Sequence, residues 1–240
     1  MLEPQRTNTI RNSSIVGAAV GNPGNLPTGW ATTINTLSRE VVGLGTENGI
    51  PYIDLRIFGT ASSGVCVTSF IQPNTQSAAS GQAWSASCYA KLISAPLAPI
   101  SYSLSLVEWN GSTFLTATSV TMSLSSSLQR FEVTRTLNNA STNNVTTYIF
   151  FGVVSGQSYD FTVRLAAPQL ELGAYATSYI PTTTTSVTRN ADSFTESNVF
   201  SRGMITAAGG TWFIEFRNNV PLLRDLSAVG LFIGDSSAVS

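Results

Sequence analysis

Trp109 and Trp30 are the side chains of this chain best suited to stacking on the face of a sugar ring. Trp109 directly precedes the pair Asn110-Gly111 and falls out of phase with the apolar positions Leu104 and Leu106. It is therefore predicted to be an exposed platform or, alternatively, a clamp on the turn. Trp30 ends a loop rich in glycine and proline, where closing the end of a core is the more common role and ligand binding the other.

Tyr52, Asp54 and Arg56 alternate along one segment, so they are expected to share one face of a strand. An aromatic ring, a carboxylate and a guanidinium on one face can together hold a sugar. The same trio is also typical of a solvated face or of a contact between subunits, and the pattern favours this second interpretation.

Asp160 and Glu171 are the acids that could brace a structural calcium ion, which binds carboxylate and carbonyl oxygens. We expect them on adjacent late strands, with loop carbonyls near Asn12 completing the site. The chain has no Asp-x-Asp-x-Asp loop, so calcium is a minor expectation, and we expect no other cofactor.

Catalytic chemistry is poorly supported by the residue types. There is no histidine, which removes the serine and cysteine hydrolase arrangements that depend on imidazole. Glycoside hydrolysis needs two carboxylates roughly 5 to 9 Å apart, and no closely spaced acidic cluster is present. We therefore expect a protein that is not an enzyme.

The composition limits the partners. Only 10% of the 240 residues are charged, against about 25% in ordinary domains, whereas 61 are serine or threonine. A net charge of −1 argues against binding nucleic acid, which needs a basic surface. No apolar run is long enough to insert into a membrane, and the start Met1–Arg6 lacks the apolar core of a signal peptide.

The elements that must position these side chains are strands, because apolar and polar residues alternate with a period of two. The clearest segments are 52–58, 82–92, 131–136 and 159–165. Asn110-Gly111 predicts a type I′ hairpin turn. About ten strands with no long helix indicate an all-β fold, an antiparallel β-sandwich or jelly roll. Cys66 and Cys88 are expected to be buried thiols, with a disulfide as the alternative.

Three segments resemble a module found in structural proteins of tailed bacteriophages, namely tail fibres, minor tail proteins and head fibres. They are Leu2–Asn8 (LEPQRTN), Ile10–Trp30 (IRNSSIVGAAVGNPGNLPTGW) and Gln169–Asp192 (QLELGAYATSYIPTTTTSVTRNAD). In that family such segments open and close a β-sandwich similar to carbohydrate-binding modules, and a concanavalin- or laminin-G-like domain follows. Sequence normally precedes the opening segment there, so Met1 is expected to start part of a longer protein.

The closing segment also has a physical interpretation. Leu170 and Leu172 are expected to face the core and Gln169 and Glu171 to face outward. Tyr179–Pro181 is expected to lie in an extended conformation across the sandwich. Closing the domain is favoured over binding a ligand. The predicted organisation is a β-sandwich over 1–180, an extended linker over 181–208, and the start of a lectin-like domain or a strand-exchanging tail over 209–240.

The resemblance implies a non-enzymatic virion protein of a phage appendage, made in the bacterial cytoplasm and commonly trimeric. Its expected partners are other virion proteins and a glycan of the host surface. Two alternatives remain open: a purely architectural adaptor or capsid decoration protein that binds no glycan, and a non-catalytic fragment of a depolymerase.

Overall fold

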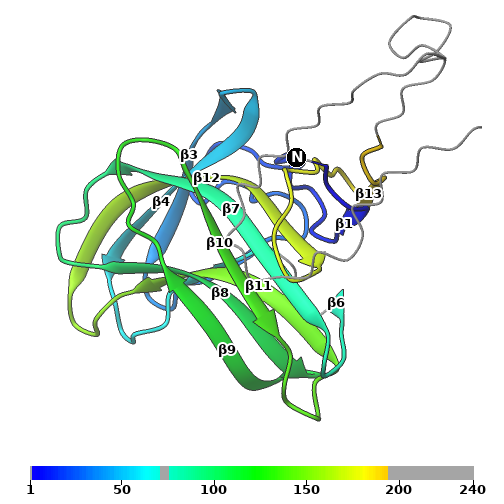
Figure 1. The fold of residues 1–240 in the computed structure, drawn as a ribbon. Helices are drawn as coiled ribbons and strands as arrows, with labels where there is room; N and C mark the ends of the chain where they lie inside the picture. Colours follow the sequence, from blue (N-terminus) through cyan, green and yellow to red (C-terminus); the bar gives the residue numbers. More distant parts are fainter. Residues whose placement is uncertain (1, 71–75, 194–240) are drawn as a thin grey trace, which may run out of the picture. The chain divides into compact units, whose positions relative to one another are not determined.

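The computed structural model describes residues 2–70 and 76–193, in which two antiparallel sheets face each other (Figure 1). The five-stranded sheet has the order β10-β7-β12-β4-β3 and the six-stranded sheet the order β2-β5-β11-β8-β9, with β6 also paired to β11. The predicted all-β antiparallel sandwich is confirmed. The described residues include no helix, and so none that is long and apolar enough to cross a membrane.

The strands of the five-stranded sheet are β3 (Ser38–Glu47), β4 (Ile50–Thr60), β7 (Ala83–Ser94), β10 (Gln129–Thr136) and β12 (Ser158–Leu172). Those of the six-stranded sheet are β2 (Ala31–Thr33), β5 (Val67–Ser69), β6 (Gln76–Ser77), β8 (Ser101–Asn110), β9 (Thr113–Thr121) and β11 (Asn144–Gly152). A separate pair joins β1 (Arg6–Asn8) to β13 (Val187–Arg189). The four segments with the clearest alternation all lie on strands.

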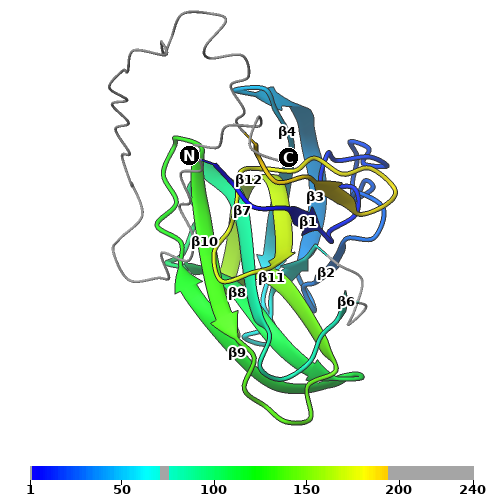
Figure 2. The same cartoon turned by 45° about the vertical axis from the view of Figure 1, so that its right-hand side comes forward.

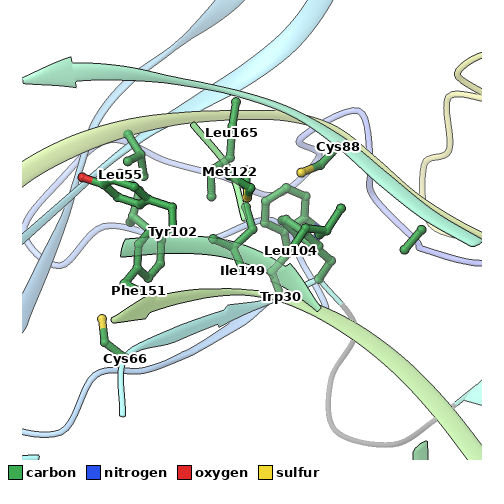
Figure 3. Close-up of a cluster of buried hydrophobic side chains, with 14 of the residues drawn as sticks. Trp30, Leu55, Cys66, Cys88, Tyr102, Leu104, Met122, Ile149, Phe151 and Leu165 are labelled. Atoms are coloured by element: carbon green, nitrogen blue, oxygen red, sulfur yellow. The ribbon is translucent and has the colours of Figure 1, made fainter. Parts of the chain in front are cut away.

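The core lies between the two sheets and is made by the alternate residues that the period of two selects. Ile53, Leu55 and Ile57 of β4 are fully buried, as are Leu104 and Leu106 of β8. Figure 3 shows such side chains meeting between the layers. Full burial of one such side chain is worth about 1.5–3 kcal/mol, so the alternation is a large part of what holds the sheets together.

Both cysteines are buried free thiols, so the disulfide alternative is wrong. Cys66 and Cys88 lie at separate places in the core cluster (Figure 3). Burial raises the pKa of each thiol to about 12, which keeps the sulfur protonated and unreactive at neutral pH.

Two Asn-Gly pairs lie at hairpin turns, but only one of them forms the type I′ turn that this pair favours. Asn48 and Gly49, between β3 and β4, both have positive φ, 52° and 79°, as a type I′ turn requires. At the predicted hairpin, β8 includes Asn110, and only Gly111 has a positive φ, 58°. The hairpin is therefore confirmed, but its two-residue turn begins at Gly111 rather than Asn110.

A β-bulge in β12 changes which residues face the core. The register with β7 shifts between Ala166 and Gln169, where Ala167 has a φ of 47°. One extra residue reverses the alternation, so Leu165 before the bulge and Leu170 after it both face the core. The prediction for Leu172 is wrong, because its side chain at the end of the strand is 50% exposed.

The segments Leu2–Asn8 and Gln169–Asp192 meet in space and form what we call the clasp. β1 and β13 pair antiparallel, and Ile180 is buried with its N–H donating to the Gln169 side chain at 2.6 Å. Gln169 and Glu171 do face away from the core, but both are buried and form hydrogen bonds with residues 177–180. Residues 3–192 form one compact unit. The first part of the predicted linker thus packs on the sandwich, and the predicted domain at 209–240 lies outside the described residues.

Candidate ligand-binding face

The outer face of the six-stranded sheet is free of charged side chains on its described strands. Outward positions are those paired in register with Trp109, Val107, Ser105 and Ser103 of β8. On the neighbouring strands they hold residues such as Asn144, Thr146, Tyr148 and Phe150 of β11 and Phe114, Ala117, Ser119 and Thr121 of β9. We call the part formed by Trp109, Phe114, Tyr148 and Phe150 the aromatic face.

Trp109 and Phe114 form the most exposed part of this aromatic face. Their rings pack edge to face with centroids 5.8 Å apart at an angle of 88°. Phe114 is 53% exposed, which is high for such a large apolar side chain, whereas Trp109 is half-buried. Trp109 thus packs against Phe114 beside the hairpin turn and is partly accessible at the surface, and its role as a binding platform stays a prediction.

Two buried polar atoms on this face have no hydrogen-bond partner among the described residues. They are Nε1 of Trp109 and Oγ1 of Thr146. Thr146 lies opposite Val107, next to Trp109 along the sheet. Unpaired buried polar groups cost about 1–3 kcal/mol each, so these two atoms lower the stability of this part of the sheet.

Tyr148 and Phe150 extend the aromatic face along β11. Both are half-buried, and burial raises the pKa of the Tyr148 hydroxyl, which therefore stays neutral and able to donate at physiological pH. Sequence reasoning missed them and Phe114. The signal was available, since Tyr148 and Phe150 fall out of phase with the core residues Ile149 and Phe151.

Tyr52, Asp54 and Arg56 do share one face of β4, on the outer side of the five-stranded sheet, but neighbouring strands use their polar groups. Arg164 donates to both carboxylate oxygens of Asp54 at 2.8 Å each. Arg56 donates in the same bidentate way to Asp160, at 2.8 and 2.7 Å. Such paired bonds across strands hold the register of the sheet.

Tyr52 is also covered. The guanidinium of Arg164 lies 3.3 Å from the centroid of the Tyr52 ring, a cation–π stack that occupies one ring face. The ring also lies across the edge strand, where a Cβ on Gly45 would come within 2.7 Å of the Tyr52 hydroxyl. Tyr52, Asp54 and Arg56 therefore brace the five-stranded sheet, and little of their surface is free to bind a sugar.

The structure does not bring Asp160 and Glu171 together. They lie on one strand rather than on adjacent strands, eleven positions apart, which is roughly 35 Å in an extended chain. Arg56 binds Asp160 and lowers its pKa. Glu171 is fully buried and accepts from the N–H and hydroxyl of Thr177 at 2.9 and 2.6 Å. A calcium ion shared by these two residues is therefore excluded by geometry, and the described residues contain no other acidic cluster suited to a metal.

Trp30 is only 5% exposed and packs edge-on against Phe70, with ring centroids 4.8 Å apart. Its ring closes the core, as the more common of the two predicted roles requires. It does not offer an open stacking face, although it lines a hollow at the side of the sandwich.

The pKa shifts resolved among the described carboxylates all have the same direction. A general acid needs a pKa raised toward neutrality. Where a shift is resolved among the described carboxylates, at Glu3, Glu47, Glu108 and Asp160, the pKa is lowered. At Glu47 and Asp160 hydrogen bonds from arginine or lysine are the main cause.

No protein-family model and no curated protein matches the chain. Among solved structures, a CBM4 structure is similar at 18% identity and a TM-score of 0.44, covering 69% of this chain and all of that one. The CBM22-1 xylan-binding domain from Paenibacillus barcinonensis Xyn10C is similar at 11% identity and a TM-score of 0.38, covering 71% and 94%. The enzymatically active domain of tailspike protein 4 of bacteriophage CBA120 is similar at 7% identity and a TM-score of 0.41, covering 69% of this chain and 21% of that one.

Proposed function

We propose that this β-sandwich is a non-catalytic glycan-binding module of a bacteriophage appendage, and that the aromatic face is its binding surface. The observation that carries the proposal is the contrast between the two outer faces. The five-stranded sheet carries cations and anions that pair with each other, such as Arg56 with Asp160 and Arg164 with Asp54. The described outward positions of the six-stranded sheet carry only aromatic, aliphatic, hydroxyl and amide groups.

Such a face suits a neutral polysaccharide. Exposed aromatic rings can stack on the apolar faces of sugar rings, and the hydroxyl and amide groups at the outward positions can bond to sugar hydroxyls. The virion assignment rests on the resemblance of the opening and closing segments to phage structural proteins, and the clasp gives both segments a shared structural role. We expect a homotrimer, to be tested by analytical ultracentrifugation of the full chain.

The test is a titration of the protein with host surface polysaccharide, comparing Trp109→Ala with the wild type. Loss of an aromatic binding residue typically costs about 2 kcal/mol or more, so affinity should fall by about 30-fold. Tyr175→Ala is the matched control, because Tyr175 is a 47% exposed aromatic residue on the clasp. Its affinity should equal that of the wild type.

Three results would change the assignment. If Tyr52→Ala abolished binding and Trp109→Ala did not, the glycan would lie on the five-stranded sheet instead. If a correctly folded wild-type protein bound no host polysaccharide at millimolar concentration, the architectural adaptor would become the better hypothesis. Release of reducing ends from the polysaccharide would show that the chain is an enzyme and would overturn the non-catalytic assignment.

A further inference from the structure

An open hollow of about 610 Å³ lies beside β2, the edge strand of the six-stranded sheet. Its lining comes from residues 25–32, together with Gly17 and Arg39. β2 and β3 are the edge strands of the two sheets on this side (Figure 2). The hollow therefore lies at these edge strands, and the loop that precedes β2 supplies most of its lining.

The guanidinium of Arg39 lies at this hollow, and no described carboxylate forms an ion pair with it. It pairs in register with the core residue Ile57, so its side chain starts from the inner face of β3. Within the described residues, the Arg39 side chain makes one hydrogen bond, a long contact of 3.5 Å from Nη2 to the carbonyl of Gly24. It forms no ion pair with a described residue. Burial lowers the pKa of Arg39, as expected for a guanidinium that is partly desolvated and uncompensated.

An arginine on the opposite side of the sandwich, Arg135, shows the kind of partner that an inward-facing guanidinium can have. Arg135 also starts from the inner face of an edge strand, β10, where it pairs in register with the core residue Trp84. There the fully buried Glu108 accepts from Arg135 Nε at 2.5 Å. One inward arginine thus has a built carboxylate partner, and the arginine at the hollow has none in the described part of the chain.

Trp30 is an aromatic residue in the lining of the same hollow. Its indole N–H is buried with no acceptor among the described residues. The complement of the Arg39 guanidinium, which has no carboxylate partner among the described residues, is an oxygen-bearing anion, and the Trp30 ring lies in the same lining.

We propose that this hollow binds an oxyanion-bearing ligand, with Arg39 contacting the anion, and that the ligand is an acidic sugar bound through its carboxylate. The size favours a sugar over a free inorganic ion, because ligand pockets typically measure about 300–1,000 Å³ and this hollow falls in that range. Leu26 and Pro27 add apolar surface to the lining, which suits a sugar ring and not a bare phosphate. The site lies on different residues from the aromatic face and does not depend on it.

The test follows the indole N–H resonance of Trp30 by NMR, identified through its loss in Trp30→Phe, during titration of the full chain. The probes are D-glucuronate, D-glucose and inorganic phosphate at matched ionic strength. D-glucuronate should shift the resonance saturably and D-glucose should not. Arg39→Met should weaken the response at least tenfold, whereas Arg11→Met, which removes the same charge from an exposed position, should leave it unchanged.

The remaining outcomes separate the sources of the anion and the two proposals. Phosphate binding as tightly as D-glucuronate would support the oxyanion site but overturn the acidic sugar. No saturable shift with any probe, in wild-type protein that is folded, would overturn the site itself. Trp109→Ala should retain the full D-glucuronate response, so failure of the aromatic face and failure of the hollow can be told apart.

Discussion

At the scale of single residues, the Glu108 carboxylate is a fully buried charge, and its hydrogen bonds determine its ionisation. Burial by itself would raise the pKa of Glu108, but hydrogen bonds from the Thr142 hydroxyl, from Arg135 and from the N–H groups of Asn138 and Asn139 outweigh it, so the pKa is lowered. Because the folded pKa lies below the unfolded one, this stabilisation is present above the unfolded value of about 4.3 and is lost as the pH falls through the folded value.

Replacing Arg135 by Met should lower the free energy of unfolding by about 3 kcal/mol at pH 7, because it leaves the buried Glu108 carboxylate without its cation. The loss should shrink at pH 4, where the carboxyl can take a proton. Urea unfolding at both pH values measures this. Arg39→Met is the matched control: it removes an inward arginine with no carboxylate partner, so stability should change little at either pH. An equal loss in both variants would contradict the pairing.

At the scale of elements, Asn8 connects the clasp to the sandwich. Its amide nitrogen donates to the carbonyls of Pro168 and Ile180 at 3.2 and 2.9 Å. Its amide oxygen accepts from the N–H groups of Ile10 and Leu170 at 3.1 and 3.2 Å. A single fully buried side chain therefore joins β1, the bulge of β12 and the Tyr179–Pro181 segment.

Asn8→Ala should destabilise the protein by about 3 kcal/mol, since it leaves several buried backbone groups without partners at about 1–3 kcal/mol each. Hydrogen exchange gives a local readout: the Leu170 amide should exchange faster, while amides in the β8–β11 ladder keep their protection relative to global stability. Thr7→Ala is the neighbouring control, because Thr7 only shares a hydroxyl contact with Thr188 at the surface. A stability loss in Thr7→Ala as large as in Asn8→Ala would argue against this role of Asn8.

At the scale of the whole molecule, the clasp decides where the folded unit ends. Beyond residue 180, Thr182 is buried and its hydroxyl donates to the carbonyl of Ile10 at 2.5 Å, and β13 supplies the partner of β1. Arg189 forms an ion pair with Glu3. The N-terminal strand thus depends on residues that the alternation pattern alone assigns to a linker.

A fragment of residues 3–192 should fold in one cooperative transition, because it contains the closed core and both halves of the clasp. A fragment of residues 3–180 should be less stable by at least about 2 kcal/mol, since it loses the buried Thr182 bonds and the β1 partner. Thermal and urea unfolding of the two fragments measures the difference. Identical unfolding curves would place the boundary at residue 180 instead.

The sequence predicted the parts of the fold that depend on local pattern. Strand alternation identified β4, β7, β10 and the first half of β12, and both cysteines were expected to be buried thiols. It could not predict the bulge at Ala167, which joins two predicted strands into one and separates Asp160 from Glu171. A bulge depends on pairing with β7 and so has no clear local signal.

The candidate site was predicted only in part, and for a related reason. Trp109 was identified because its phase along one strand is visible in the sequence. The pairing of Asp54 with Arg164 joins residues 110 positions apart, and the stacking of Arg164 on Tyr52 depends on the same register. A sequence shows that a side chain faces outward, but only its neighbours decide whether it is free.

By itself, then, the sequence determined that this chain is an antiparallel β-sandwich with few charges and many hydroxyls, because period-two alternation and composition are local properties. Tertiary structure alone decided which outer face is braced by ion pairs and which is left aromatic and uncharged. It also decided that one inward arginine meets a buried carboxylate while the other faces a hollow. These outcomes depend on strand order and register, which bring together residues that the chain keeps far apart.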